Sequence, residues 1–121
     1  MNCLIVEDQP LISADLRAQM EELGYTCYEA AGTSEAAYHF KTHHFDLILL
    51  DLHVKDGISL PLVDYLQITN TDATVILITG SGAFPNGENA VIAPRIDYVL
   101  RKPVNPTDLA ALAEYSRRMA S

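Results

Sequence analysis

Short apolar runs alternate with longer segments of helical period along the whole chain, and this alternation constrains the fold most. Four apolar residues in a row precede Asp51, a pattern typical of a strand that is buried on both faces. We expect strands over 3–6, 25–30, 47–50, 74–79 and 97–100. Strands that alternate with helices predict an α/β protein, here a (βα)5 doubly wound sheet of five parallel strands.

Helix signals follow the strands. The first helix presents an apolar face and ends at Gly24, and the second is expected to take Thr33 or Ser34 as its N-cap. A third helix is predicted from Gly57 to about Ile68. The last opens with Asn105 as cap, followed by Pro106 at the first helical position and then by Leu109, which is expected to be buried.

The segment between Thr79 and Asp97 is different, because it is rich in glycine and proline. Only "ENAVIA" could be helical there, which is well below the ~12 to 15 residues that marginal isolated helicity requires. We therefore expect a short or irregular fourth helix.

Composition limits the class of protein. With 121 residues and 49% hydrophobic content, the chain is long enough for one domain with a full core. Its 8 basic against 16 acidic residues give a net charge of −8, which disfavours nucleic acid as a partner. No apolar run approaches the roughly 20 residues that span a membrane, and the N-terminus lacks signal-peptide features, so we expect a cytoplasmic protein. Cys3 and Cys27 do not form a zinc or redox motif and are expected to be buried free thiols.

Polar residues collect where the expected strands end. They are Glu7, Asp8, Asp51, Thr79 and Lys102. In a parallel α/β sheet the carboxyl ends of the strands form the ligand site. Carboxylates about 4 Å apart repel one another by on the order of 4 kcal/mol per pair at an effective dielectric near 20, so this site requires a cation. Oxygen ligands of this kind suit Mg²⁺.

The same residues are equipped for phosphoryl chemistry. A carboxylate such as Asp51 can accept a phosphoryl group and form an aspartyl phosphate. Lys102 supplies a fixed positive charge and Thr79 a hydroxyl donor, both suited to the charge that develops during the transfer. Asp51 is therefore the candidate nucleophile.

Four short motifs in this order resemble the receiver domain of two-component response regulators: "VED", "LILLD", "LITG" and "LRKP". The resemblance covers essentially the whole chain and implies a sheet of order 2-1-3-4-5. It implies that Asp51 receives its phosphoryl group from a sensor histidine kinase in a Mg²⁺-dependent reaction. "VILITGSG" is also similar to a Thr-Gly subgroup of single-domain receivers associated with HWE or HisKA2 kinases.

The resemblance also implies individual roles. Asp8 and Asp51 would be direct Mg²⁺ ligands, Glu7 would act mainly through water, and the backbone carbonyl of His53 would complete the set. Thr79 and Lys102 would contact the phosphoryl oxygens. The Lys102-Pro103 peptide bond would be cis.

Three departures limit how far the family's conformational switch carries over. The position three before Lys102 is usually aromatic and is Val99 here. The loop after Asp51 is short and carries Lys55 where proline is common. The region of the fourth helix is irregular, and we predict that Gly80 to Pro94 is itself the segment that responds to phosphorylation.

We expect residues 1–121 to be one receiver domain without an output domain. It would signal through contacts with a histidine phosphotransfer protein or a downstream regulator, or act as a phosphate sink. One alternative is a Mg²⁺-dependent phosphatase with an aspartyl nucleophile, although His53 stands where its second aspartate would be. A non-phosphorylated, receiver-like binding module is the other. We do not expect an enzyme that acts on other substrates.

Overall fold

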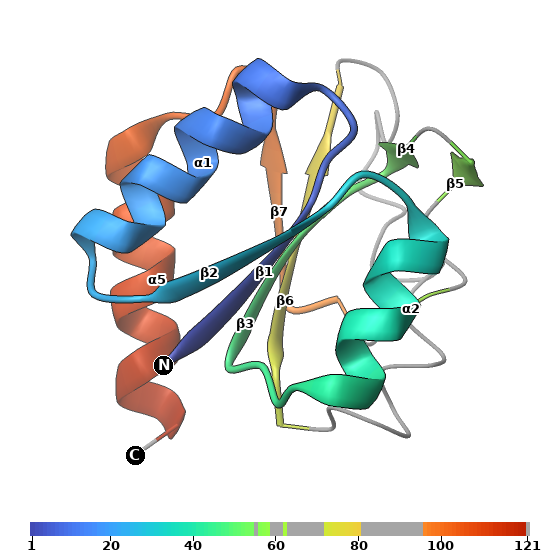
Figure 1. Ribbon diagram of the computed structural model, residues 1–121. Helices are drawn as coiled ribbons and strands as arrows, with labels where there is room; N and C mark the ends of the chain where they lie inside the picture. The colour runs from blue at the N-terminus through green and yellow to red at the C-terminus, as the bar shows by residue number, and fades with distance from the viewer. Residues whose placement is uncertain (55, 59–61, 63–71, 81–95, 121) are drawn as a thin grey trace.

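A parallel sheet of five strands forms the centre of the computed structural model, which describes residues 1–54, 56–58, 62, 72–80 and 96–120 (Figure 1). The strand order is β2-β1-β3-β6-β7, which confirms the predicted 2-1-3-4-5 order of the five long strands. The strands are β1 (Asn2–Val6), β2 (Thr26–Ala30), β3 (Leu47–Asp51), β6 (Thr74–Thr79) and β7 (Tyr98–Arg101).

Helices cover both faces of this sheet, as a doubly wound fold requires. α1 (Pro10–Glu22) and α5 (Pro106–Ala120) lie on one face, and α2 (Thr33–Thr42) lies on the other (Figure 1). Each face has its own buried cluster. The α1/α5-side core includes Leu16 and Leu109, and the α2-side core includes Phe40.

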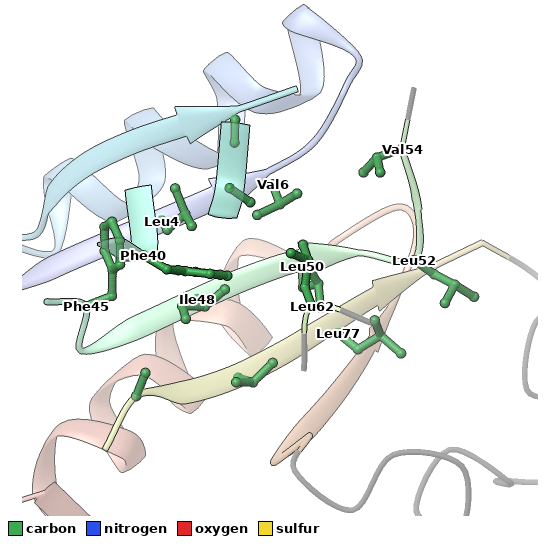
Figure 2. Close-up of a cluster of buried hydrophobic side chains, with 14 residues drawn as sticks. Leu4, Val6, Phe40, Phe45, Ile48, Leu50, Leu52, Val54, Leu62 and Leu77 are labelled. Atoms are coloured by element: carbon green, nitrogen blue, oxygen red, sulfur yellow. The ribbon is translucent and has the colours of Figure 1, made fainter. Parts of the chain in front are cut away.

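The central strand β3 shows why the sequence forms this sheet. All of its residues are buried, and they alternate between the two faces. Leu47 and Leu49 join the α1/α5-side core, whereas Ile48 and Leu50 join the α2-side core (Figure 2). A strand with helices on both faces must be apolar at every position, which is the pattern that the sequence presents.

Two of the expected helix ends are confirmed. α1 is followed by Gly24 with φ 95°, in the left-handed region that glycine adopts without steric cost. At the start of α5, the Asn105 side chain accepts hydrogen bonds from the backbone N–H groups of Thr107 (2.8 Å) and Asp108 (3.3 Å). Pro106 is the first residue of this helix, as predicted.

Two other expectations about helix starts are wrong. α2 begins at Thr33 with Gly32 as its N-cap, so neither Thr33 nor Ser34 has that role, because a remote side chain binds the first N–H groups instead. Gly57 does not open a helix. It belongs to an antiparallel hairpin of β4 (His53–Val54) and β5 (Gly57–Ile58) that follows β3.

Other predictions fall on parts of the chain that are not described. Leu62 is helical and buried, but the rest of the predicted third helix after Ile58 lies outside the described residues. The same holds for the short fourth helix and, apart from Gly80, for the predicted responsive segment. Among the helices of the described ranges, none combines the length and apolar character that crossing a membrane would need.

Candidate functional site

The polar residues singled out in the sequence meet at the carboxyl edge of the sheet. Glu7 follows β1, Asp51 ends β3, Thr79 ends β6 and Lys102 follows β7. β1, β3, β6 and β7 are consecutive neighbours in the sheet, so these ends lie side by side. The backbone N–H of Lys102 donates to the Thr79 carbonyl (2.9 Å), which continues the pairing of β6 with β7 up to the site.

Three carboxylates form a compact cluster at this edge. Glu7, Asp8 and Asp51 each offer an oxygen, and these oxygens lie within 4.8 Å of one another. Glu7 and Asp51 are nearly buried, with 4% and 5% of their surfaces exposed, whereas Asp8 lies on the partly exposed rim. The Asp8 backbone N–H donates to Glu7 Oε2 (3.1 Å), which holds the two neighbouring residues together.

Lys102 is the cation that faces this cluster. Its Nζ lies 3.1 Å from Glu7 Oε1 and 3.1 Å from Asp51 Oδ2. Burial lowers the pKa of Lys102, but the hydrogen bonds and charges of Asp51 and Glu7 more than offset this effect and raise the pKa above its ordinary value. Lys102 therefore stays protonated, and its two contacts link the end of β7 to the ends of β1 and β3.

One ammonium group does not neutralise the cluster. Burial and the neighbouring Asp51 raise the pKa of Glu7 from 4.5 to about 7, although Lys102 acts in the opposite direction. Three carboxylates face one ammonium group, so negative charge is in excess here when all three are ionised. The donor set is made of oxygen atoms only, so the residues present fit a hard divalent cation such as Mg²⁺.

His53 lies just beyond Asp51, in β4. Its backbone N–H is 3.4 Å from Asp51 Oδ1, and its side chain is exposed. This places the His53 backbone beside the cluster. The role of its carbonyl as a metal ligand stays a prediction.

Thr79 is completely buried at the end of β6. Its hydroxyl donates to the carbonyl of Gly80 (2.9 Å). Thr79 therefore has the expected location, and a contact with a phosphoryl oxygen requires its hydroxyl to exchange partners.

The Lys102-Pro103 bond is cis, as the family resemblance implied.

The substitution at Val99 has a clear structural setting. Val99 packs against the α2-side core, whereas its neighbour Tyr98 packs against the α1/α5-side core. Tyr98 also meets Tyr115 of α5 edge to face, with ring centroids 6.1 Å apart. As alternation along a strand predicts, Tyr98 faces away from the side on which the missing aromatic residue would lie.

Asp56 was not among the residues predicted from the sequence. This residue lies at the tip of the β4–β5 hairpin, and its carboxylate binds the first turn of α2. A local signal was present in Gly57, which follows the tip with a φ of 129°, a conformation that glycine adopts without steric cost. The partner in α2 is remote in sequence and leaves no such signal.

Comparison with known proteins agrees with this geometry. Residues 3–114 match the family model of the response regulator receiver domain. The chain belongs to the response regulator receiver domain family, and receiver domains are signalling domains. The match favours neither the phosphatase alternative nor an unrelated fold.

Individual relatives point the same way. The chain is 31% identical over 111 residues to the response regulator protein PilR of Pseudomonas aeruginosa, covering 92% of this chain and 24% of PilR. Because the chain spans only about a quarter of that relative, the activities of PilR as a whole do not transfer to it.

Solved structures share the fold over almost the entire chain. A CheY-like receiver domain protein from Methanospirillum hungatei superposes with a TM-score of 0.87 at 25% identity, covering 98% of this chain and 94% of that one. TrrA from Thermotoga maritima, solved in complex with Mg²⁺-BeF, gives a TM-score of 0.81 at 23% identity, with coverages of 95% and 97%. The latter likeness concerns the fold alone.

Proposed function

We propose that Asp51 accepts a phosphoryl group from the phosphohistidine of a sensor histidine kinase in a Mg²⁺-dependent reaction. The observation that carries this proposal is the position of Lys102 Nζ, 3.1 Å from both Glu7 and Asp51 at the carboxyl edge of the sheet. A rigidly held carboxylate beside a fixed cation is suited to receive an incoming anionic group. Membership of the receiver family supports the same assignment.

The residues that would hold Mg²⁺ are Glu7, Asp8, Asp51 and the backbone carbonyl of His53. The first three already cluster within 4.8 Å, and the structural neighbour TrrA was solved with Mg²⁺. When bound, the ion supplies positive charge that neutralises both the cluster and the transferred phosphoryl group. This addition is needed because Lys102 alone leaves the cluster with excess negative charge.

Asp51, Lys102 and Thr79 have different roles in the transfer. An oxygen of Asp51 forms the new bond to phosphorus while the P–N bond of the donor breaks, and the bonding electron pair leaves with the imidazole nitrogen. Lys102 and the hydroxyl of Thr79 stabilise the phosphoryl oxygens. Attack by water later releases inorganic phosphate and restores the Asp51 carboxylate, so the protein acts on its own phosphoryl group only.

The partners follow from this chemistry. A histidine kinase supplies the phosphoryl group, and a histidine phosphotransfer protein or a downstream regulator receives the signal through protein contacts. We place these events in the cytoplasm, because Cys3 and Cys27 are both free thiols, as is usual in a reducing compartment. The association with HWE or HisKA2 kinases through the Thr-Gly pair stays a prediction.

Intact-mass spectrometry tests the proposal directly. The protein is incubated with a small phosphodonor such as phosphoramidate, with and without Mg²⁺. We expect the mass to increase by one phosphoryl group only with Mg²⁺, and we expect no increase in Asp51→Asn. A wild-type protein that stays unmodified with every donor and with candidate kinases would refute the proposal.

A further inference from the structure

Asp56 joins the hairpin next to Asp51 to a separate helix. Its Oδ1 accepts a hydrogen bond from the backbone N–H of Thr33 (2.8 Å), and its Oδ2 accepts from the Thr33 hydroxyl (2.8 Å) and the Ser34 N–H (3.3 Å). These donors lower the pKa of the Asp56 carboxyl, with the Thr33 backbone as the main cause. Asp56 therefore supplies the cap that Gly32, which has no side chain, cannot provide to α2.

Gly32 makes room for this contact. A Cβ atom at Gly32 would lie 2.8 Å from Asp56 Oδ1, closer than such atoms approach each other. The backbone of Gly32 is extended, with φ −159°, so any residue could adopt its conformation. A larger residue at this position would therefore have to displace the Asp56 carboxylate.

The other end of the hairpin is fixed by the core. Leu52 and Val54 are 6% and 7% exposed and belong to the α2-side core (Figure 2). The backbone N–H of Leu52 donates to the carbonyl of Ile78 (2.9 Å), which ties the start of the hairpin to β6. His53 lies between Leu52 and Val54, and it pairs with Ile58 of β5, the strand that follows Asp56.

Such a hairpin needs tertiary support. β4 and β5 have two residues each, and a two-stranded hairpin is marginal at best on its own. Its tip is exposed to solvent and makes its described contacts with the start of α2, as Figure 1 shows for the two elements. If the Asp56 contacts were lost, then among the contacts of the described residues only the short pairing of β4 with β5 would hold the tip.

We propose that Asp56 is a positioning residue of the phosphoacceptor site: by holding the β4–β5 hairpin on α2, it keeps the His53 backbone and the Asp51 carboxylate in place for the metal ion. This inference rests on the proposed function and extends it to a residue outside the acidic cluster. Binding of Mg²⁺ and ordering of the α2 N-terminus are then coupled. Because such coupling is reciprocal, each must strengthen the other by the same free energy.

Three variants separate this role from simple helix capping. Asp56→Ala removes the hydrogen bonds of this carboxylate to Thr33 and Ser34, and Gly32→Ala displaces the carboxylate without changing Asp56. Asp56→Asn keeps one acceptor oxygen and is the conservative variant. Ser116→Ala is the matched control, since it removes one hydrogen bond, from the Ser116 hydroxyl to Thr74 Oγ1 (2.6 Å), at the opposite edge of the sheet.

Mg²⁺ affinity, measured by calorimetry on each protein, is the first readout. We expect Asp56→Ala and Gly32→Ala to weaken binding by on the order of tenfold, the low end of what outer-shell substitutions cost. Asp56→Asn should lie between them and wild type, and Ser116→Ala should match wild type. Thermal unfolding of all four proteins checks that each is folded.

Amide hydrogen exchange is the second readout. In wild type, Mg²⁺ should slow exchange at Thr33 and Ser34, and this slowing should vanish in Asp56→Ala. Affinities in Asp56→Ala and Gly32→Ala equal to that of Ser116→Ala, or no response of Thr33 and Ser34 to Mg²⁺ in wild type, would overturn the inference. Wild type that binds Mg²⁺ but accepts no phosphoryl group would overturn the proposed function alone.

Discussion

The two edges of the sheet use carboxylates in opposite ways. At the amino edge, Asp46 precedes β3 and its Oδ2 accepts the backbone N–H of Asn2 (2.8 Å). Asp97 precedes β7 and its Oδ2 accepts the N–H of Val75 (2.9 Å). At the carboxyl edge, Glu7 and Asp51 instead face each other and share the ammonium group of Lys102.

Strand direction explains this difference. The amino ends of parallel strands present unpaired N–H groups, which are donors that a carboxylate can accept directly. The carboxyl ends present carbonyl groups, which cannot satisfy a negative charge. Backbone donors therefore satisfy the carboxylates at the amino edge, whereas those at the carboxyl edge need a cation, which Lys102 supplies in part.

Among the substitutions that test this difference between the two edges, removal of Lys102 should change the free energy of unfolding most. We expect Lys102→Met to lower the free energy of unfolding of the metal-free protein by about 2 kcal/mol near about pH 8, because Glu7 and Asp51 lose their shared cation. The loss stays below the ~3–5 kcal/mol seen when a fully buried partner is removed, because the Lys102 side chain is 24% exposed. Urea unfolding measures it.

The control for Lys102→Met removes an exposed charge. Arg118→Met deletes a cation from α5 whose side chain is 76% exposed, so its effect should be within the small range of surface ion pairs. At about pH 5.5 Glu7 is protonated, so Lys102→Met should lower the free energy of unfolding by less. Equal losses at both pH values would contradict the assignment of the effect to Glu7 and Asp51.

The pH dependence of the site comes next in size. The folded protein holds the Glu7 proton up to a pKa of about 7, against an ordinary value of 4.5. Between these values the folded state binds more protons than the unfolded state, so the stability of the metal-free protein falls as pH rises through this window. Mg²⁺ affinity should rise over the same window, because the ion replaces that proton.

Calorimetric Mg²⁺ titrations across this window check the expectation. In Glu7→Gln the site has no proton to lose at this position, so its Mg²⁺ affinity should change little with pH between about 5.5 and about 8. Wild-type affinity that is flat over the same range would show that Glu7 does not control metal binding.

The sequence predicted the strands, and the meeting of polar residues at one edge of the sheet, because both depend on local patterns. An apolar run such as 47–50 is typical of a strand that is buried on both faces of a sheet, and the structure confirms this strand. Residues placed directly after such strands must meet at one edge, and Glu7, Asp51 and Lys102 do so. The packing of Val99 and Tyr98 against opposite faces of the sheet followed from the same alternation.

Contacts between distant segments were beyond this reasoning. Thr33 and Ser34 are good capping residues, but Asp56 takes the role from another loop, more than twenty residues away in the sequence. The apolar spacing after Gly57 predicted a helix from that residue, but Gly57 instead pairs with Val54 in a hairpin. Both wrong predictions concern the β4–β5 hairpin and the start of α2, which Asp56 joins.

The smallest expected effect on function belongs to the amino edge. Asp46→Ala removes the acceptor of the Asn2 N–H, and we expect it to lower the free energy of unfolding by about 1 kcal/mol, as loss of one hydrogen bond does. Mg²⁺ affinity and the rate of phosphoryl uptake at Asp51 should not change, because β3 separates Asp46 from the site by its full length. Urea unfolding and intact mass over time measure the two quantities. If Asp46→Ala slowed phosphoryl uptake as much as it lowered stability, the division of the sheet into a structural edge and a chemical edge would be wrong.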